Sequence, residues 1–425
     1  MNKLHQTQKK ERALLVLVEE RNERWSRQDL ADEFKNLVLS TGIEVADLIP
    51  VKLAIPNPSC YIGKGKVQEI ALIVDEEGAN VVIFNNNLNF TQQRNLEEAF
   101  GTKTLDRTQL ILDIFAKHAQ TQEGILQVEL AQLEYLLPRL RGKGIMLSRL
   151  GGGIGTRGPG EKKLEVDRRR IAERIGRLKK ELDTVKQHRS IMRKRRKKEM
   201  VPICSLVGYT SAGKTTLFNA LTQDSQQVSS ALFTTLDTVI RSFTVHNNAS
   251  AVLSDTVGFI YKLPHHLIDS FKATLEELNF ADVLLQVVDA SNKEILKFKK
   301  AVDRVLEELK LENKPIITIF NKIDKLDSAD IKRLQEDYPQ AIFISAKTKQ
   351  GLDELRNAIY EELFKDVIEV VVKVPFNRMD IANYLHENAQ VLKTTYKEQQ
   401  ALFWVKIKKN ELFYLQKQGL SIKEL

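Results

Sequence analysis

The stretch Gly208-Tyr209-Thr210-Ser211-Ala212-Gly213-Lys214-Thr215-Thr216 decides the fold of the chain around it. It matches the phosphate-binding pattern G-x-x-x-x-G-K-[ST], follows the apolar run Ile203–Val207 and precedes the run Leu217–Leu221, which has helical spacing. The glycines let successive backbone N–H groups point inward, where the positive end of the following helix also points. Lys214 is predicted to reach the β- and γ-phosphates of a nucleotide, and the Thr215 hydroxyl to bind Mg²⁺. A plain glycine turn with a surface lysine is the alternative.

Three partner motifs follow in order, and they favour a guanine-nucleotide site. Asp255-Thr256-Val257-Gly258 comes directly after a predicted strand. Asp255 is expected to hold Mg²⁺ through water, and the Gly258 N–H to sense the γ-phosphate. The Asp324 carboxylate of Asn321-Lys322-Ile323-Asp324 can accept hydrogen bonds from guanine, which can exclude the wrong base by about 10⁴-fold. Ser345-Ala346-Lys347 is predicted to complete the base pocket, so the predicted ligands are GTP and Mg²⁺.

The first switch and the catalytic group are less well defined by the sequence. Phe233-Thr234-Thr235-Leu236-Asp237 lies between the phosphate loop and Asp255, and Thr235 is the predicted ligand of Mg²⁺, with Thr234 as its competitor. Many GTPases carry a water-orienting glutamine after the glycine of the second motif, but this chain has Phe259. Because phenylalanine cannot hold a water, we expect slow intrinsic hydrolysis or help from a partner. No catalytic residue is assigned, and His265-His266 are interpreted as surface residues.

Composition sets the broad class of the protein. A chain of 425 residues with 42% hydrophobic and 28% charged residues suggests two to four domains. Its apolar runs are too short to span a membrane, and the polar segment Met1–Arg12 has no apolar signal core. Cys60 and Cys204 fit neither a close disulfide pair nor a metal spacing, so reduced thiols are expected. A cytoplasmic monomer is expected, with a membrane-peripheral location as the alternative.

The patterns predict an α/β fold in four parts. Residues 1–107 are predicted to form a small parallel α/β subdomain and 108–200 a helical hairpin. Residues 201–365 are predicted to form a Ras-like P-loop GTPase domain and 366–425 a small α+β domain. The strands expected in the first part are Ala13–Val18, Val51–Ile55, Val81–Phe84 and Lys103–Leu105, and its helices are Arg27–Leu39, Lys66–Asp75 and Thr91–Phe100. The GTPase domain adds strands Ala251–Ser254, Val283–Val288, Ile316–Phe320 and Ala341–Ile344, and the last part has strands Val367–Val374 and Leu402–Ile407 around a helix Asp380–Leu392.

Positive charge is concentrated in the predicted hairpin. From Arg139 to Met200 there are 22 Lys or Arg and 7 Asp or Glu, a net charge of +15, whereas the whole chain carries +9. Leucines spaced 4, 3, 4, 3 from Leu126 and a similar seam from Ile171 predict two antiparallel helices. The predicted connection Arg141–Gly160 has eight glycines. Its cations could bind the phosphates of structured RNA, with a disordered linker as the alternative; they are Arg141, Lys143, Arg149 and Arg157.

Together these features resemble the HflX family of GTPases along essentially the whole chain. The resemblance rests on Tyr61–Lys66, Asp106–Asp113, Leu126–Leu133, Gly151–Glu161, Asp167–Ile171, Gly208–Thr216 and Asp255–Phe259. It implies a ribosome-associated GTPase that binds the large subunit and its rRNA near the peptidyl-transferase centre and splits or rescues ribosomes under stress.

The resemblance also implies ATP binding in the N-terminal region, where Gly63–Lys66 on its own is more typical of a plain turn. The chain departs from the family at Ser211, where family members often carry an asparagine that can support potassium, and at Thr238-Val239, where Pro-Thr is common. Two alternatives remain open: a GTP-gated rRNA-binding or assembly module with incidental turnover, and an ATP-dependent RNA remodeller.

Overall fold

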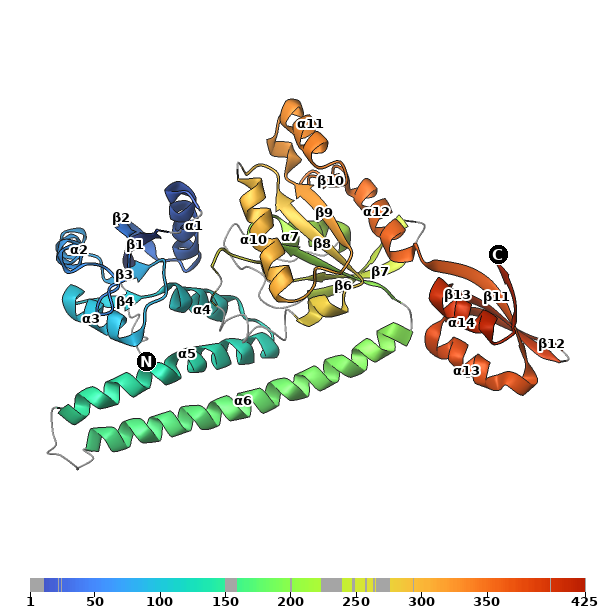
Figure 1. The fold of residues 1–425 in the computed structure, drawn as a ribbon, viewed down its shortest axis with the longest axis horizontal. Coiled ribbons are helices and arrows are strands. Elements are labelled where there is room, and N and C mark those ends of the chain that lie inside the picture. Colours follow the sequence, from blue (N-terminus) through green and yellow to red (C-terminus); the bar gives the residue numbers. More distant parts are fainter. Residues whose placement is uncertain are drawn as a thin grey trace, which may run out of the picture. The chain divides into compact units, whose positions relative to one another are not determined.

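The computed structural model describes residues 11–424 except 22, 24, 150–158, 199–200, 223–238, 247–248, 257, 263, 265–275, 293 and 398. For residues 141–149, 159–164, 186, 188–198, 276 and 424 it describes the backbone alone. The predicted fold class is confirmed, because three separate sheets with their helices and one long helical pair follow each other along the chain (Figure 1).

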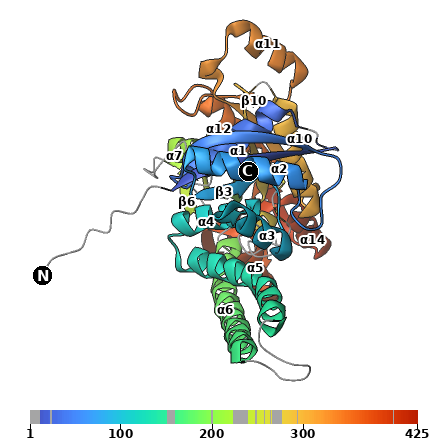
Figure 2. The same cartoon turned by 90° about the vertical axis from the view of Figure 1, so that its left-hand side faces the viewer.

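The N-terminal sheet is parallel throughout and has the order β2-β1-β3-β4. Helices α2 and α3 contact each other and share a core with one face of β1 and β3, whereas α1 packs on β1 beside α4, which packs on β3 (Figure 2). Residues Ala13–Val18 of β1 are completely buried. The elements are β1 (Arg12–Glu20), α1 (Arg27–Ser40), β2 (Glu44–Leu53), α2 (Lys64–Glu77), β3 (Val81–Phe84), α3 (Phe90–Phe100), β4 (Lys103–Leu105) and α4 (Arg107–His118).

The second strand of this sheet differs from its prediction. The expected strand Val51–Ile55 covers only the end of β2, which begins at Glu44 and runs parallel to β1. Pro50 lies inside this strand, opposite Leu17. A proline is tolerated there because β2 is an edge strand, where one side needs no ladder hydrogen bond. The first part of the strand has no apolar pattern that predicts it, because most residues of β2 are exposed or only partly buried.

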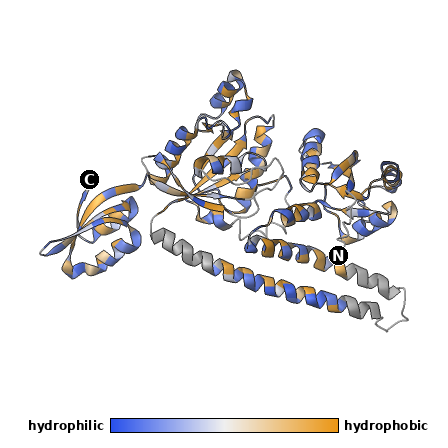
Figure 3. Cartoon of the chain, turned by 180° about the vertical axis from the view of Figure 1, so that it is seen from behind, coloured by the Kyte–Doolittle hydropathy of each residue, from blue (hydrophilic) through white to orange (hydrophobic). Residues whose placement is uncertain are grey.

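The long helices are α5 (Gln122–Arg149) and α6 (Pro159–Lys198). Leu126 and Leu130 pack against Leu178 and Leu182, so the two predicted seams meet. Two ion pairs flank the seam: both Glu129 carboxylate oxygens accept from Arg174 at 2.7 and 2.8 Å, and Lys179 lies 2.9 Å from Glu134. The described residues of α6 that carry a hydropathy colour are mostly hydrophilic (Figure 3).

The predicted loop Arg141–Gly160 is wrong at its start, because α5 continues as a helix to Arg149. Isolated glycines cost a helix only about 1 kcal/mol each, so Gly142 and Gly144 do not end it. The dense glycine cluster begins at Gly151. Residues 150–158, including the predicted RNA contact Arg157, lie outside the described residues.

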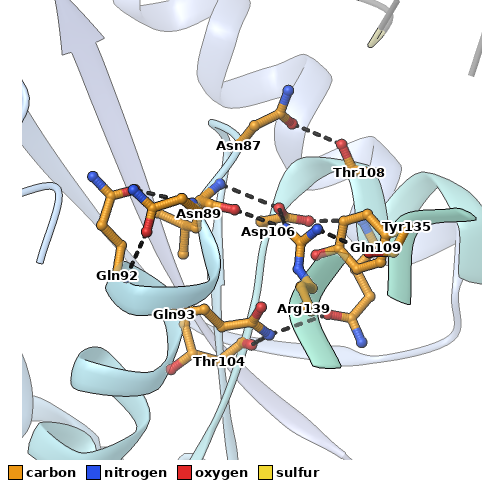
Figure 4. Close-up of polar contacts among 11 residues, drawn as sticks. Asn87, Asn89, Gln92, Gln93, Thr104, Asp106, Thr108, Gln109, Tyr135 and Arg139 are labelled. Atoms are coloured by element: carbon orange, nitrogen blue, oxygen red, sulfur yellow. Dashed lines mark hydrogen bonds and ion pairs between the residues drawn. The ribbon is translucent and has the colours of Figure 1, made fainter. Parts of the chain in front are cut away.

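A buried polar cluster attaches α5 to the N-terminal sheet (Figure 4). Asp106 is completely buried and accepts hydrogen bonds from the backbone N–H groups of Gln109, at 2.8 Å, and Leu88, at 3.2 Å. The guanidinium of Arg139 on α5 donates to Asp106 at 3.2 Å and to the Leu88 carbonyl at 2.8 Å. It also lies 3.4 Å from the centroid of the Tyr135 ring. Burial raises the pKa of Asp106, and the Gln109 N–H and the Arg139 charge oppose this rise.

The central sheet has six strands in the order β10-β9-β8-β5-β7-β6. Neighbours pair in parallel except β6, which is antiparallel to β7. Strand β6 was not predicted, because Phe243 is its one buried residue. The elements are β5 (Ile203–Gly208), α7 (Lys214–Thr222), β6 (Val239–Thr244), β7 (Ser250–Asp255), β8 (Val283–Asp289), α10 (Ile295–Glu308), β9 (Ile316–Asn321), α11 (Ser328–Asp337), β10 (Ile342–Phe343) and α12 (Leu352–Phe364).

The C-terminal sheet is antiparallel, with the order β12-β13-β11-β14. The predicted helix Asp380–Leu392 ends earlier, at Asn388, and its last residues belong to a strand that was not predicted. The elements are β11 (Val367–Pro375), α13 (Met379–Asn388), β12 (Gln390–Lys397), β13 (Gln400–Lys408), α14 (Lys409–Lys417) and β14 (Ser421–Glu424). Throughout the described part of the chain, no helix combines the length and apolar character that crossing a membrane requires.

Candidate functional site

The phosphate loop joins β5 to α7 and comes close to two neighbouring segments. At Gly208 a Cβ atom would lie 2.3 Å from the carbonyl oxygen of Val287 in β8. At Gly213, where φ is +93°, a Cβ atom would lie 2.3 Å from the Asn321 side-chain nitrogen. Ser211 also has a positive φ, of +61°, although it is not glycine. Both glycines are therefore required by close packing around the loop.

Lys214 begins α7 and is folded back into the loop. Its ammonium group donates to the carbonyl oxygens of Gly208, at 3.0 Å, and Tyr209, at 2.8 Å. Burial is the main cause that lowers the pKa of Lys214 to about 8. The negative charge of Asp255 acts to raise this pKa, and the positive charge of Lys322 acts to lower it further. A phosphate would supply the negative charge that a buried ammonium group favours.

Two side-chain oxygen atoms that could bind a metal ion, one of a hydroxyl and one of a carboxylate, lie beside this lysine. The Thr215 hydroxyl donates to a carboxylate oxygen of Asp255 at 2.9 Å, and Asp255 is completely buried at the end of β7. The neighbouring Thr256 hydroxyl donates to the Leu206 carbonyl at 2.6 Å, which ties the end of β7 to β5. A hydroxyl and a carboxylate are the hard oxygen ligands that Mg²⁺ prefers, so the pair fits this ion.

Phe259 is held to the phosphate loop by its backbone. Its N–H donates to the Gly208 carbonyl at 3.1 Å, and its carbonyl accepts from the Thr210 N–H at 2.8 Å. The ring is only 2% exposed and contributes to the core. Two residues on, the Tyr261 N–H donates to the Tyr209 hydroxyl at 2.8 Å. The start of the second switch is thus paired with the phosphate loop.

The base motif is fastened to the phosphate loop through Asn321, at the end of β9. Its side-chain nitrogen donates to the Ala212 carbonyl at 2.9 Å, and its side-chain oxygen accepts from the Ala346 N–H at 3.0 Å. The exposed Asp324 accepts from the Ser345 hydroxyl at 2.6 Å. These contacts bring the phosphate loop, Asn321–Asp324 and Ser345–Lys347 to the same edge of the sheet.

Sequence reasoning missed Asp289, which ends β8. Its carboxylate accepts from Lys322 at 2.6 Å, and the same ammonium group donates to the Ser211 carbonyl at 2.7 Å. An aspartate at the carboxyl end of a buried parallel strand, beside the phosphate-loop strand, is the signal that could have found it.

Several predicted residues cannot be placed. Phe233–Asp237, Val257 and His265-His266 lie outside the described residues. Arg141, Lys143 and Arg149 are described only as helical backbone. In the N-terminal part, Gly63–Lys66 spans the start of α2, and the hydroxyl of the preceding Tyr61 donates to Glu20 at 2.6 Å.

Comparison with known proteins gives matches along most of the chain. Family models described as GTP-binding GTPase N-terminal and GTP-binding GTPase Middle Region match residues 28–116 and 118–196. A 50S ribosome-binding GTPase model matches residues 203–322, and a model of the C-terminal region of that domain matches 293–364.

Individual proteins are also similar. GTPase HflX of Caldanaerobacter subterraneus subsp. tengcongensis is 46% identical, over 92% of this chain and 89% of that protein. GTPase HflX of Lacrimispora saccharolytica is 44% identical over 91% of both chains. The crystal structure of SsGBP in complex with GDP is 27% identical, covers 84% of this chain and 99% of that one, and gives a TM-score of 0.46.

Proposed function

The chain belongs to the HflX family of GTPases, and on that premise we propose that it hydrolyses GTP on the large ribosomal subunit and splits or rescues ribosomes under stress. The observation that carries the proposal is the joining of the phosphate loop, Asp255 and the guanine motif at one sheet edge, in a chain whose residues 139–200 carry a net charge of +15. The match to a model described as a 50S ribosome-binding GTPase supports the choice of subunit.

In the proposed site, the backbone of Gly208–Thr216 and the Lys214 ammonium bind the phosphates, and Asp324 binds guanine. Asn321 positions the loop, because it bonds both Ala212 and Ala346. Lys322, Ile323 and Ser345–Lys347 complete the proposed base pocket. Gly258 lies against the loop, where a Cβ atom would be 2.8 Å from the Thr210 methyl group and 3.0 Å from the Lys214 nitrogen.

Mg²⁺ would be held by Thr215 directly and by Asp255 through water, with Thr235 as the further proposed ligand. When bound, it neutralises charge on the β- and γ-phosphates. The residues contribute a preformed pair of oxygen ligands, since Thr215 and Asp255 already touch. The buried Phe259 ring offers no group to orient the attacking water, so we infer a low intrinsic rate that the ribosome raises.

The test of this function is GTP turnover with and without purified large subunits. We expect stimulation of at least tenfold at low salt, falling steeply as salt rises, because contacts between cations and RNA phosphates release counterions. Equal turnover with and without subunits would contradict the proposal. A non-hydrolysable GTP analogue is expected to increase sedimentation of the protein with the subunits.

The contribution of the basic hairpin can be tested on described residues of α6. Arg169 and Arg170 have side chains 73% and 74% exposed, so the double variant Arg169→Gln/Arg170→Gln changes charge with little effect on packing. We expect it to weaken subunit-stimulated turnover about tenfold and to lower the salt slope. Lys332→Gln/Arg333→Gln on α11 is the matched control and is expected to have no effect, since both residues are exposed on another element.

The lowered pKa of Lys214 predicts that both the stability of the protein and its affinity for GTP depend on pH. The folded-state pKa of this lysine, about 8, lies below the ordinary value of 10.5. Between about pH 8 and pH 10.5 the unfolded chain binds more protons than the folded chain does. The nucleotide-free protein therefore becomes more stable as pH rises from about 8. GTP, in contrast, requires the charged lysine, so its affinity should fall above about pH 8 and approach a tenfold loss per pH unit. Titration with a fluorescent GTP analogue between about pH 7 and 9 checks this; Lys214→Arg, whose charge is permanent, should show no such fall.

A further inference from the structure

The C-terminal sheet has helices on only one of its faces. Its chain order is β11-α13-β12-β13-α14-β14, and the strands lie in the order β12-β13-β11-β14. This is the split β-α-β arrangement, in which both helices pack on the same side. The residues that pack with α13 and α14 alternate along the two central strands; they are Val370, Val372, Val374, Ala401, Phe403, Val405 and Ile407.

The residues between them define the opposite face, which we call the lysine face. The strand register aligns Lys393 and Val371 with Trp404, and Lys423 with Val371. Its lysines are Lys373, Lys393, Lys397, Lys406, Lys408 and Lys423, and all but the half-buried Lys406 are exposed. Among the described side chains of these strands, the one carboxylate on this face is Glu369, which lies 2.9 Å from Lys406. The face therefore carries a strong excess of positive charge.

An apolar centre lies among these lysines. Val371 and Leu402 are each 9% exposed, and both share this face with the partly exposed Trp404, which Val371 faces in the strand register. The Lys393 ammonium group lies 5.4 Å from the centroid of the Trp404 ring. An aromatic ring surrounded by cations on an open sheet is the arrangement that stacks an unpaired base and neutralises the phosphates on either side of it.

We propose that the lysine face binds single-stranded RNA, with Trp404 stacked on one base and the surrounding lysines contacting phosphates. Charge complementarity favours a polyanion, and the central ring favours one whose bases are exposed. A duplex keeps its bases stacked inside and would leave Trp404 without a partner. The inference goes beyond the GTPase function, since none of its residues belongs to the nucleotide site or to the basic hairpin.

Tryptophan fluorescence gives a local test in the full chain. The chain has two tryptophans, and Trp25 is buried in the N-terminal part, so Trp25→Phe leaves Trp404 as the one reporter. Titration with an unstructured RNA of about 12 nucleotides should quench its emission saturably, because a stacked base quenches the indole. The same sequence as a duplex should not. RNA bound at the hairpin alone would raise the anisotropy of a labelled oligonucleotide without quenching Trp404, and that result would overturn the proposal.

Variants then test the ring and the charges. Trp404→Leu is expected to weaken binding to single-stranded RNA about tenfold, whereas Trp404→Phe should retain most of it because a ring can still stack. The Trp404→Phe comparison keeps the test valid if Trp404→Leu lowers the stability of this domain, which circular dichroism would detect. Equal affinity of the unsubstituted protein and the two variants for the RNA would contradict a stacking role of Trp404.

For the charges, Lys373→Glu/Lys393→Glu should reduce the salt slope by about 1.4, as expected for two lost phosphate contacts on a single strand. The matched control is Lys409→Glu/Lys417→Glu on α14, which makes the same charge change on the opposite side of the sheet. Equal losses in the two double variants would show a nonspecific charge effect and overturn the proposal. Quenching of Trp404 by polyglutamate but not by RNA would instead assign the face to an acidic protein. Subunit-stimulated GTP turnover, measured in parallel, reports separately on the proposed function.

Discussion

Replacing Asp324 with asparagine is expected to weaken GTP binding by about 10⁴-fold and to create affinity for xanthosine triphosphate. The carboxylate accepts from N1–H and the 2-amino group of guanine in the proposed site, and an amide cannot accept both bonds. The Ser345 hydroxyl, which donates to Asp324 at 2.6 Å, should also donate to the amide oxygen of the asparagine. The amide nitrogen would then face the base, where it can donate to the 2-oxo group of xanthine.

Nucleotide dissociation constants for both triphosphates measure this exchange. Asp327→Asn is a suitable control, because Asp327 lies three residues further on, accepts from the Asp330 N–H as the cap of α11, and can be replaced there by asparagine at little cost. Lost GTP binding without any gain for xanthosine triphosphate, in a folded protein, would contradict the assignment of Asp324 to the base.

Gly213→Ala is the second change with a large expected effect. The new Cβ would lie 2.3 Å from the Asn321 nitrogen, and φ of +93° disfavours any side chain. Asn321 cannot move away cheaply, because it is buried and bonds both Ala212 and Ala346. We expect GTP affinity to fall at least 100-fold and the free energy of unfolding to fall by about 3 kcal/mol.

Gly419→Ala is the control that separates the two effects of Gly213→Ala, the strain of a side chain at positive φ and the clash of the new Cβ atom with Asn321. Gly419 has φ of +73°, and a Cβ atom there would have no neighbour within 4 Å. Its substitution should cost about 1–2 kcal/mol and leave GTP binding unchanged. Thermal unfolding and nucleotide titration of both variants check the comparison. If Gly213→Ala behaved like Gly419→Ala, the close packing of the loop on Asn321 would not be needed for binding.

The sequence predicted best those elements whose pattern arises from local burial. Strands β3 and β4 have the predicted limits: β3 is an apolar run between Asn80 and Asn85, and β4 is the short segment Lys103–Leu105, whose last two residues are buried. The leucine seams also meet as predicted, because a repeat of four and three residues places Leu126 and Leu130 on one helical face. The alternation of strands and helices in residues 201–365 similarly predicted the α/β domain in which the phosphate loop and the base motif meet.

Other features depend on partners distant in the sequence. The edge strand β6 has little apolar alternation and exists through its pairing with β7. Asp289 becomes part of the candidate site only because β8 lies beside both β5 and β9. The Asp106–Arg139 contact likewise joins residues 33 positions apart, and no local pattern announces it.

The pairing of Phe259 with Gly208 and Thr210 constrains how the site can signal which nucleotide it holds. Releasing Phe259 would break two backbone hydrogen bonds in a buried environment, which costs more than breaking them in water. A rearrangement on loss of the γ-phosphate is therefore expected to leave Phe259 in place on the phosphate loop. Phe259 would thereby have two effects: its ring, which cannot assist the hydrolytic water, would keep GTP hydrolysis slow, and its backbone would keep the start of the second switch attached to the phosphate loop.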